Sequence, residues 1–134
     1  MKDEREKGRG EMMPKAYVKF ETPKDLNDKI LQLIEAAKNN GKLRRGTNET
    51  TKAIEKGQVQ LVVMAEDVEP EEILMHIPVL CEEKKIPYCY VASKQELGRA
   101  SGIDVPTAAL GVADAGDGKD LLKEVLKKLQ ALKK

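Results

Sequence analysis

The sequence contains no tryptophan, a single histidine and two cysteines among its 134 residues. Cys81 and Cys89 lack the spacing of a metal site, so we predict two small thiols in the core. His76 lies in an apolar helical pattern with no Ser or Cys placed as its nucleophile. This favours a position on a helix surface or at the edge of the core. Residues for catalysis and metal binding are therefore scarce, and we expect neither an enzyme nor a bound cofactor.

Long apolar runs are also missing. No run approaches the roughly 20 residues that a transmembrane helix needs, and residues 1–10 lack the apolar centre of a signal peptide. These absences predict a soluble, cytoplasmic protein without a membrane partner. A chain of this length is typical of one domain. We expect residues 1–12, which are charged and contain glycine, to form a flexible leader, and residues 13–134 to form the domain.

The formal net charge is only +1, but the charged residues are unevenly distributed. Residues 38–56 hold six Lys or Arg against two Glu, a net charge of +4. Residues 118–134 hold six Lys against two acids, also +4, whereas residues 66–84 hold seven acids against one Lys, a net charge of −6. Such poles create strong local fields even in a nearly neutral protein, although solvated helix faces would explain each of them equally well.

Two helices are predicted in the first half of the chain. The first spans residues 22–41, with Thr22 as its cap and Pro23 at the first helical position. The second spans residues 46–57 between two glycines. Both carry apolar residues at helical spacing, so each has one face for a core.

Three further helices are predicted in the second half. One begins at Pro70 and is interrupted or kinked at Pro78. Another begins at Ser93, where residues 93–96 form a capping box. The last places a stripe of leucines and one valine on one face of residues 118–134.

Strands alternate with these helices. Apolar, β-rich runs predict strands at residues 59–65, 86–91 and 108–113, and a short strand or turn at residues 43–45. Residues 59–65 are apolar throughout, which is typical of a strand covered on both faces. The alternation predicts an α/β fold, with one sheet sandwiched between helices.

Two familiar ligand sites are excluded. Gly41 and Gly46 have the spacing of a Walker motif, but Thr47 stands where the motif requires a Lys and no covered strand leads into the loop. The carboxylates of residues 66–83 lack the spacing of an EF-hand.

The start of the second helix carries an unusual set of polar groups. Asn48 and Lys52 are neighbours at i, i+4 spacing, Glu49 lies between them, and Arg44 and Arg45 come just before. The helix N-terminus adds N–H groups suited to phosphate. These features favour a polar recognition site, and a capped, solvated helix start is the alternative.

Three segments closely resemble the L7Ae family of archaeal large-subunit ribosomal proteins, which bind kink-turn RNA. They are Leu43-Arg44-Arg45-Gly46-Thr47-Asn48-Glu49-Thr50-Thr51-Lys52, Val63-Met64-Ala65-Glu66-Asp67-Val68-Glu69-Pro70 and Leu97-Gly98-Arg99-Ala100-Ser101-Gly102. The resemblance covers residues 14–132, with the segments in the family's order. It implies a three-layer α-β-α sandwich around a mixed four-stranded sheet, and an RNA face made of the second helix and the loop after the fourth.

The resemblance also implies which residues contact RNA. They are Lys42, Arg44, Arg45, Gly46, Thr47, Asn48, Glu49, Lys52, Glu69, Ile73, Lys94, Ile103, Asp104, Val105 and Pro106. A guanine in a sheared G·A pair leaves its N1–H and O6 free, so a carboxylate such as that of Glu49 can accept from the first while Lys52 donates to the second.

The loop at residues 102–106 has two interpretations. From the residues alone we would expect it to face the core, because it contains Ile103 and Val105. The resemblance instead implies that it packs on the flipped-out nucleotide of the kink, with Glu69, Ile73 and Lys94 lining the base pocket. Because the sequence has few aromatic residues, the base would then stack on aliphatic side chains instead of aromatic rings. Val105 replaces an arginine of some relatives, so we expect a broader tolerance of RNA loops.

The resemblance implies a component of the large ribosomal subunit that is also a core protein of box C/D and H/ACA guide RNPs and of RNase P, which processes tRNA. The expected partners are rRNA, box C/D and H/ACA guide RNAs, RNase P RNA and the protein partners of the guide RNPs, with the free protein a monomer. The alternative is a protein-interaction scaffold of similar fold without specific RNA readout.

Overall fold

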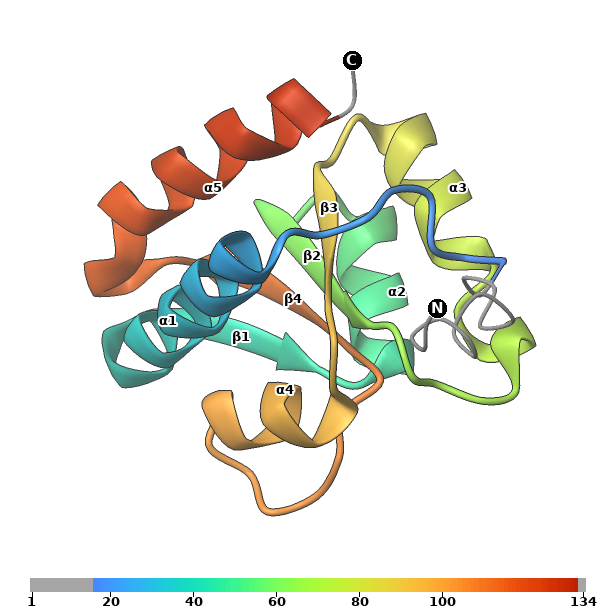
Figure 1. The fold of residues 1–134 in the computed structure, drawn as a ribbon, viewed down its shortest axis with the longest axis horizontal. Helices are drawn as coiled ribbons and strands as arrows, with labels where there is room; N and C mark the ends of the chain where they lie inside the picture. The colour runs from blue at the N-terminus through green and yellow to red at the C-terminus, as the bar shows by residue number, and fades with distance from the viewer. Residues whose placement is uncertain (1–15, 133–134) are drawn as a thin grey trace, which may run out of the picture.

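The computed structural model describes residues 16–132, and within them a four-stranded sheet lies between two groups of helices (Figure 1). The predicted leader, residues 1–12, and the expected start of the domain at residue 13 lie outside the described residues. The predicted α/β architecture with a mixed four-stranded sheet is confirmed.

The sheet has the strand order β1-β4-β2-β3. Its strands are β1 (Lys42–Arg45), β2 (Leu61–Ala65), β3 (Tyr88–Val91) and β4 (Ala109–Asp114). β4 runs antiparallel to both β1 and β2, whereas β2 and β3 are parallel. Every residue of β2 is buried, as predicted for a strand covered on both faces, and every residue of β3 is buried as well.

Because of the directions of the strands, four connecting loops lie at one end of the sheet. Arg45 pairs with Leu110, and Ala65 pairs with Val91, so β1, β2 and β3 finish where β4 begins. The loops that follow β1, β2 and β3 and the loop that precedes β4 therefore share one edge. We call this edge the loop end of the sheet.

Helices cover both faces of the sheet (Figure 1). α1 (Lys24–Asn40) and α5 (Lys119–Leu132) lie against each other on one side, and α2 (Thr47–Glu55) and α3 (His76–Lys84) lie on the other. The short helix α4 (Lys94–Ala100) packs against α1. The predicted leucine stripe of α5 faces the core through its buried residues Leu122, Val125 and Leu129.

The predicted start of the first helix is wrong by one residue. Pro23 has extended dihedral angles, φ −61° and ψ 154°, so it stands outside the helix, and its carbonyl accepts the first helical hydrogen bond, from Asn27 N at 2.9 Å. The Thr22 hydroxyl is buried without a hydrogen-bond partner and does not cap the helix. The predicted end at Gly41 is confirmed.

The third predicted helix is broken before Pro78 rather than at it. Residues after Pro70 form the 3₁₀ helix η1 (Glu71–Ile73), and α3 begins only at His76. Pro78 occupies the first turn of α3, where a backbone N–H has no acceptor within the helix. The proline is therefore accommodated without a kink.

All four aromatic side chains of the sequence serve the fold. Tyr17, Phe20, Tyr88 and Tyr90 form one cluster along β3, with ring centroids 5.0 to 6.5 Å apart. The Tyr17 hydroxyl donates to Ala65 O at 2.8 Å. These rings are therefore committed to packing, and none lies at the start of α2 or in the loop of residues 102–106.

The scarce reactive residues lie where the sequence predicts. Cys81 and Cys89 are both buried free thiols, and burial raises the pKa of the Cys89 thiol far above its ordinary value. His76 is exposed at the start of α3. In residues 16–132, no helix is long and apolar enough to cross a membrane.

Candidate nucleic-acid interface

A glycine makes the turn from β1 into α2. Gly46 has φ +94°, in the left-handed region that favours glycine, and nothing fills the space beside it. Its N–H donates to Ala109 O at 2.9 Å, and its carbonyl accepts from Thr50 N at 2.9 Å. Gly46, the N-cap residue of α2, has no side chain that could cap the helix, so within residues 16–132 it leaves the first N–H groups of α2 to an acceptor from outside.

The polar residues predicted at the start of α2 are exposed together. Asn48, Glu49 and Lys52 all lie on the outer side of the helix, where i, i+3 and i, i+4 spacing makes them neighbours. Thr50 is fully buried on the inner side, and its hydroxyl donates to Arg44 O at 3.2 Å. The exposed set thus stands on a helix that is anchored to the sheet through its other face.

The loop of residues 102–106 is fastened to α4 at both ends. Ile103 N donates to Gly98 O at 3.1 Å, and Thr107 N donates to Lys94 O at 3.0 Å. The loop also approaches α4 closely at Gly98. A β-carbon at this position would lie 2.1 Å from Val105 O, so only glycine leaves room for the loop. The Val105 side chain is 60% exposed. The core-facing position expected from the residues alone is therefore wrong for Val105, whose carbonyl lies against Gly98 of α4, whereas Ile103 is half-buried.

Arg45 joins the two predicted RNA-contacting elements. Its Nε and Nη2 donate to Ser101 O at 3.0 and 2.6 Å, which fastens the end of β1 to the end of α4. The hydrogen bond from Gly46 to Ala109 makes a second link, between the start of α2 and the start of β4. The start of α2 and the loop of residues 102–106 are therefore held in a fixed relation at the loop end of the sheet.

The three residues expected to line a base pocket reach the same end from two other loops. Glu69 and Ile73 follow β2, and Lys94 begins α4 after β3. Lys94 N donates to the Asp67 carboxylate at 2.9 Å, which connects these loops. The Ile73 side chain is 39% exposed. An apolar, partly exposed side chain thus stands on each of two loops, Ile73 on one and Val105 on the other.

The structure does not bring Lys42 into this group. Lys42 pairs with Asp114 at the far end of β1, three residues before Arg45 and therefore about 10 Å along the strand. Arg44 is exposed on the edge strand closer to the turn. The predicted residues thus form a main group at the loop end of the sheet, with Lys42 at a distance.

Sequence reasoning missed the residues that position this group. Gly98, Ser101, Thr107 and Asp67 contact the loops through hydrogen bonds or close packing. Gly98 carries a signal that could have been noticed: a glycine inside a helix costs about 1 kcal/mol relative to alanine. A close approach of another backbone explains why a helix accepts that cost.

Helix α3 supports α2 through His76. The Thr51 hydroxyl lies 2.8 Å from Thr47 O and 2.9 Å from His76 Nε2. Because a hydroxyl has one proton, Thr51 donates to Thr47 and accepts from an Nε2–H of His76. His76 is thus a partner of α2 at the helix surface, consistent with the non-catalytic position predicted for it.

Glu66 is a carboxyl group near the loop end whose pKa is raised. Its partial burial and the neighbouring carboxylates of Glu21 and Asp67 raise its pKa above the ordinary 4.5. Among residues 16–132, no group of three or more His, Cys, Asp or Glu side chains is placed to hold a metal ion.

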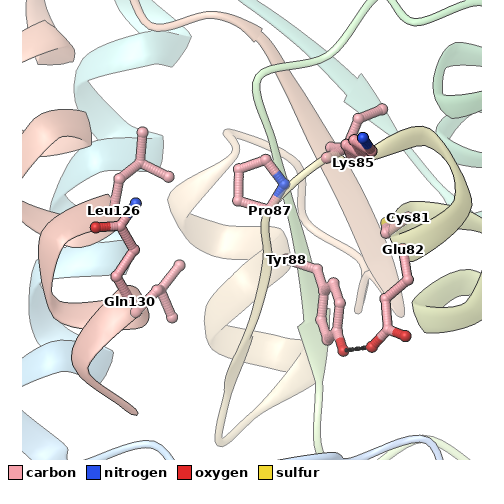
Figure 2. Close-up of a pocket in the computed structure, with 9 residues that line it drawn as sticks. Cys81, Glu82, Lys85, Pro87, Tyr88, Leu126 and Gln130 are labelled. Atoms are coloured by element: carbon pink, nitrogen blue, oxygen red, sulfur yellow. Dashed lines mark hydrogen bonds between the residues drawn. The ribbon is translucent and has the colours of Figure 1, made fainter. Parts of the chain in front are cut away.

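A groove of about 410 Å³ lies at the opposite end of the sheet, between α3, the start of β3 and α5 (Figure 2). Pro87 and Tyr88 form its floor, with Leu126 and Gln130 on one wall and Lys85 on the other. Tyr88 and Glu82, which both line the groove, bond to each other: the Tyr88 hydroxyl donates to the Glu82 carboxylate at 2.6 Å. None of the predicted site residues lines this groove.

Comparisons with known proteins identify the family of this chain. A family model described as the ribosomal protein L7Ae/L30e/S12e/Gadd45 family matches residues 28–122. The solved structure of a 15.5kD RNA binding protein from Giardia lamblia is 32% identical in sequence to this chain, with a TM-score of 0.79. The match covers 87% of this chain and 96% of the Giardia protein. On the extent of both matches, this chain belongs to the ribosomal protein L7Ae/L30e/S12e/Gadd45 family.

Proposed function

We propose that this protein binds kink-turn RNA and stabilises its bent conformation. The observation that carries the proposal is the linkage between the start of α2 and the loop of residues 102–106. Arg45 and Gly46 connect them through hydrogen bonds to Ser101 and Ala109. A polar surface and an apolar loop in a fixed relation suit an RNA motif that combines unusual base pairs with an unstacked nucleotide.

The family consists of structural and binding proteins rather than enzymes. The Giardia relative is itself named as an RNA binding protein. Both facts favour RNA as the partner of the polar surface and agree with the lack of catalytic candidates in the sequence.

The polar half of the site suits tandem sheared G·A pairs. Glu49 would accept a hydrogen bond from a guanine N1–H, and Lys52 would donate to O6, with Asn48 as a third polar contact. In an ordinary RNA duplex these guanine groups are engaged in pairing, and the deep, narrow major groove excludes side chains. The open N–H groups at the start of α2 would take a nearby phosphate.

The apolar half suits the nucleotide that leaves the stack at the kink. Val105 and Ile73 offer exposed aliphatic surface, while Glu69 and Lys94 would contact the polar edge of the base. The aromatic side chains are all in the cluster along β3, so base stacking would rest on aliphatic groups. Val105 offers no hydrogen bond, which suits tolerance of different bases at this position.

The mechanism we propose is a shift of population. An RNA that exchanges between extended and kinked forms is drawn to the kinked form by the difference in affinity for the two. The rigid connection between α2 and the loop supplies this difference, because an extended RNA cannot meet both surfaces at once.

The family resemblance leads us to propose rRNA, box C/D and H/ACA guide RNAs and RNase P RNA as clients. The protein would then be a component of the archaeal large ribosomal subunit and a core protein of guide RNPs and of RNase P in the cytoplasm, with a role in tRNA processing. Each client presents the same RNA motif, so one site would serve them all.

We place the protein partners of these particles on the acidic segment, residues 66–84. Met75 and Val79 are 43% and 55% exposed there, one helical turn apart and close to Glu82 and Glu83. Charge reversal at Glu82 and Glu83 should block the docking of partners and leave RNA binding unchanged. If both variants still assemble complete particles, the acidic segment is not a docking surface.

A titration of the protein with two RNAs tests the proposed function. The first RNA contains a kink-turn, and in the second its sheared G·A pairs are changed to Watson–Crick pairs. At physiological salt we expect tight binding to the first RNA only. Equal, weak and strongly salt-dependent binding to both would instead indicate a charged surface without specific readout, and would favour the alternative of a protein-interaction scaffold.

A further inference from the structure

Helix α5 carries charges of two kinds, paired and unpaired. Glu124 accepts a hydrogen bond from Lys29 at 3.1 Å, and Lys128 lies 3.7 Å from Asp25, so both of these residues face α1. Three other lysines of α5 are exposed and make no ion pair within residues 16–132: they are Lys119, Lys123 and Lys127. We call these three residues the α5 lysine stripe.

The stripe forms one continuous line. Its members follow each other at i, i+4 spacing, so their side chains lie on one side of the helix, about 6 Å apart along the axis. The core-facing residues Leu122, Val125 and Leu129 lie on another side and hold α5 in place. The stripe therefore presents three positive charges from a fixed support.

Helix α5 lies on the opposite side of the sheet from α2 (Figure 1). A ligand on the lysine stripe would leave the start of α2 and the loop of residues 102–106 free. A ligand on the stripe would therefore be a second partner or a second segment of the same partner.

We propose that the α5 lysine stripe binds the phosphate backbone of a second RNA helix without reading its sequence. Lysines act as strongly hydrated point charges, which suits phosphate contacts that carry no sequence information. The proposal goes beyond the proposed kink-turn function, because it concerns another surface. With both surfaces occupied, one protein would hold two RNA segments together.

The composition of the surface favours RNA over other acidic partners. The large hydrophobic side chains that are exposed in residues 16–132 are Ile73, Met75, Val79 and Val105, none of which belongs to α5. A helix that lies on a membrane surface inserts an apolar face, whereas the apolar face of α5 packs on the core through Leu122, Val125 and Leu129. The buried centre of a protein interface is also depleted in charged residues. Asp120 is also exposed, three residues before Lys123, so the three lysines outnumber the acid beside them. A mainly cationic contact is typical of a nucleic-acid backbone.

The test uses the full chain saturated with unlabelled kink-turn RNA. A fluorescent, fully paired RNA duplex without a kink-turn is then titrated at several salt concentrations. The variant is Lys119→Gln, Lys123→Gln and Lys127→Gln combined. The control combines Lys19→Gln, Lys56→Gln and Lys84→Gln, which removes the same charge from exposed lysines of three other segments. Circular dichroism and melting temperature establish that both variants are folded.

We expect the stripe variant to bind the duplex about tenfold more weakly at low salt, and the control to bind like the wild type. The slope of log K against log salt should become shallower by about 2 to 3, as expected for the loss of three phosphate contacts. Affinity for the kink-turn RNA should stay the same. If the kink-turn RNA does not bind at all, the proposed function fails, but the comparison of the two variants on the duplex still decides this proposal.

Several results would overturn the proposal. One is an equal loss of duplex binding in both variants, which would indicate scattered surface charge. Another is an unchanged duplex affinity together with lost binding to phosphatidylserine vesicles or to polyglutamate. Those outcomes would assign the stripe to a membrane surface or to an acidic protein.

Discussion

At the residue scale, the proposed site divides into side chains that meet the solvent and side chains that hold them. Asn48, Glu49 and Lys52 are exposed and free to meet a ligand. Thr50 and Arg45 instead bond to backbone carbonyls, those of Arg44 and Ser101. We therefore expect Arg45 to act mainly by positioning the loop, although it was predicted as a direct RNA contact.

The raised pKa of Glu66 leads to a prediction of how the stability of the protein depends on pH. Burial and the nearby Glu21 and Asp67 raise the pKa of this carboxyl in the folded state, so the folded protein binds the proton more tightly than the unfolded chain. Stability from this group is therefore present at low pH and is lost as pH rises from the unfolded-state pKa through the folded-state pKa. Glu66→Gln should accordingly raise the melting temperature at pH 7.

The same substitution should change little at acidic pH, where Glu66 is protonated in both states. Thermal unfolding of the wild type and of Glu66→Gln at pH 7 and near pH 3.5 measures this directly. A variant that is less stable than the wild type at pH 7 would show that the ionised carboxylate has a stabilising partner.

Val105 gives a prediction for the apolar contact. Val105→Ser should weaken kink-turn binding about fivefold, or about 1 kcal/mol, because less apolar surface is removed from water on binding. The melting temperature should change little, since the side chain is exposed. Val79→Ser is the matched control, with a similarly exposed valine on α3. Equal RNA affinities for the two variants would remove Val105 from the interface.

At the scale of elements, the loop of residues 102–106 depends on α4. Gly98→Ala would place a methyl group against Val105 O and force the loop away from the helix. We expect a loss of about 1 to 3 kcal/mol in the free energy of unfolding. Kink-turn affinity should fall as well, because the loop would no longer keep its relation to α2.

Gly57→Ala separates the two effects. Gly57 has φ +68° with open space beside it, so alanine there strains the backbone without touching the loop. It should lower stability and leave RNA affinity unchanged. Denaturant unfolding and RNA titration on both variants make the comparison, and full RNA affinity in folded Gly98→Ala would show that loop position does not matter.

Local sequence signals predicted most elements correctly. Ser93 caps α4, with its hydroxyl 3.2 Å from Gln95 N and 3.3 Å from Glu96 N, and Gly46 marks the start of α2. In these cases the signal and its effect lie within a few residues. The polar group on α2 was predictable for the same reason, because it lies on one helical face.

Other features depend on contacts that are distant in sequence. The cluster of Tyr17, Phe20, Tyr88 and Tyr90 joins residues about 70 positions apart. The outward position of Val105 follows from the packing of its carbonyl on Gly98, and the link between Arg45 and Ser101 spans 56 residues. Periodicity within a segment contains no information about such contacts, although the family resemblance did imply an exposed loop.

At the scale of the whole molecule, the surfaces are separated by the fold. The loop end of the sheet carries the candidate RNA site, and α5 presents its lysine stripe on the far side of the sheet from α2 (Figure 1). A net charge of +1 therefore describes none of these surfaces. On the function that we propose, RNA binding depends on where the strands end and not on overall charge.

The free protein should be a monomer. The four large hydrophobic side chains exposed in residues 16–132 are Ile73 in η1, Met75 just before α3, Val79 on α3 and Val105 in the loop after α4. They offer little apolar surface for a stable dimer. Light scattering should give a mass near 14.9 kDa at all concentrations tested. A mass that doubles as concentration rises would contradict this expectation.

The central claim is that Glu49 on α2 recognises the sheared G·A pairs of a kink-turn. Its most direct test is a calorimetric cycle in which the wild type and Glu49→Ala are each titrated with the kink-turn RNA and with its Watson–Crick-paired counterpart. Glu55→Ala, an exposed glutamate at the other end of α2, is the control. We predict that Glu49→Ala loses about tenfold or more in affinity for the kink-turn RNA, in the range for hydrogen bonds to charged groups, and nothing for the paired RNA. An equal change on both RNAs, or no change on either, would contradict the account.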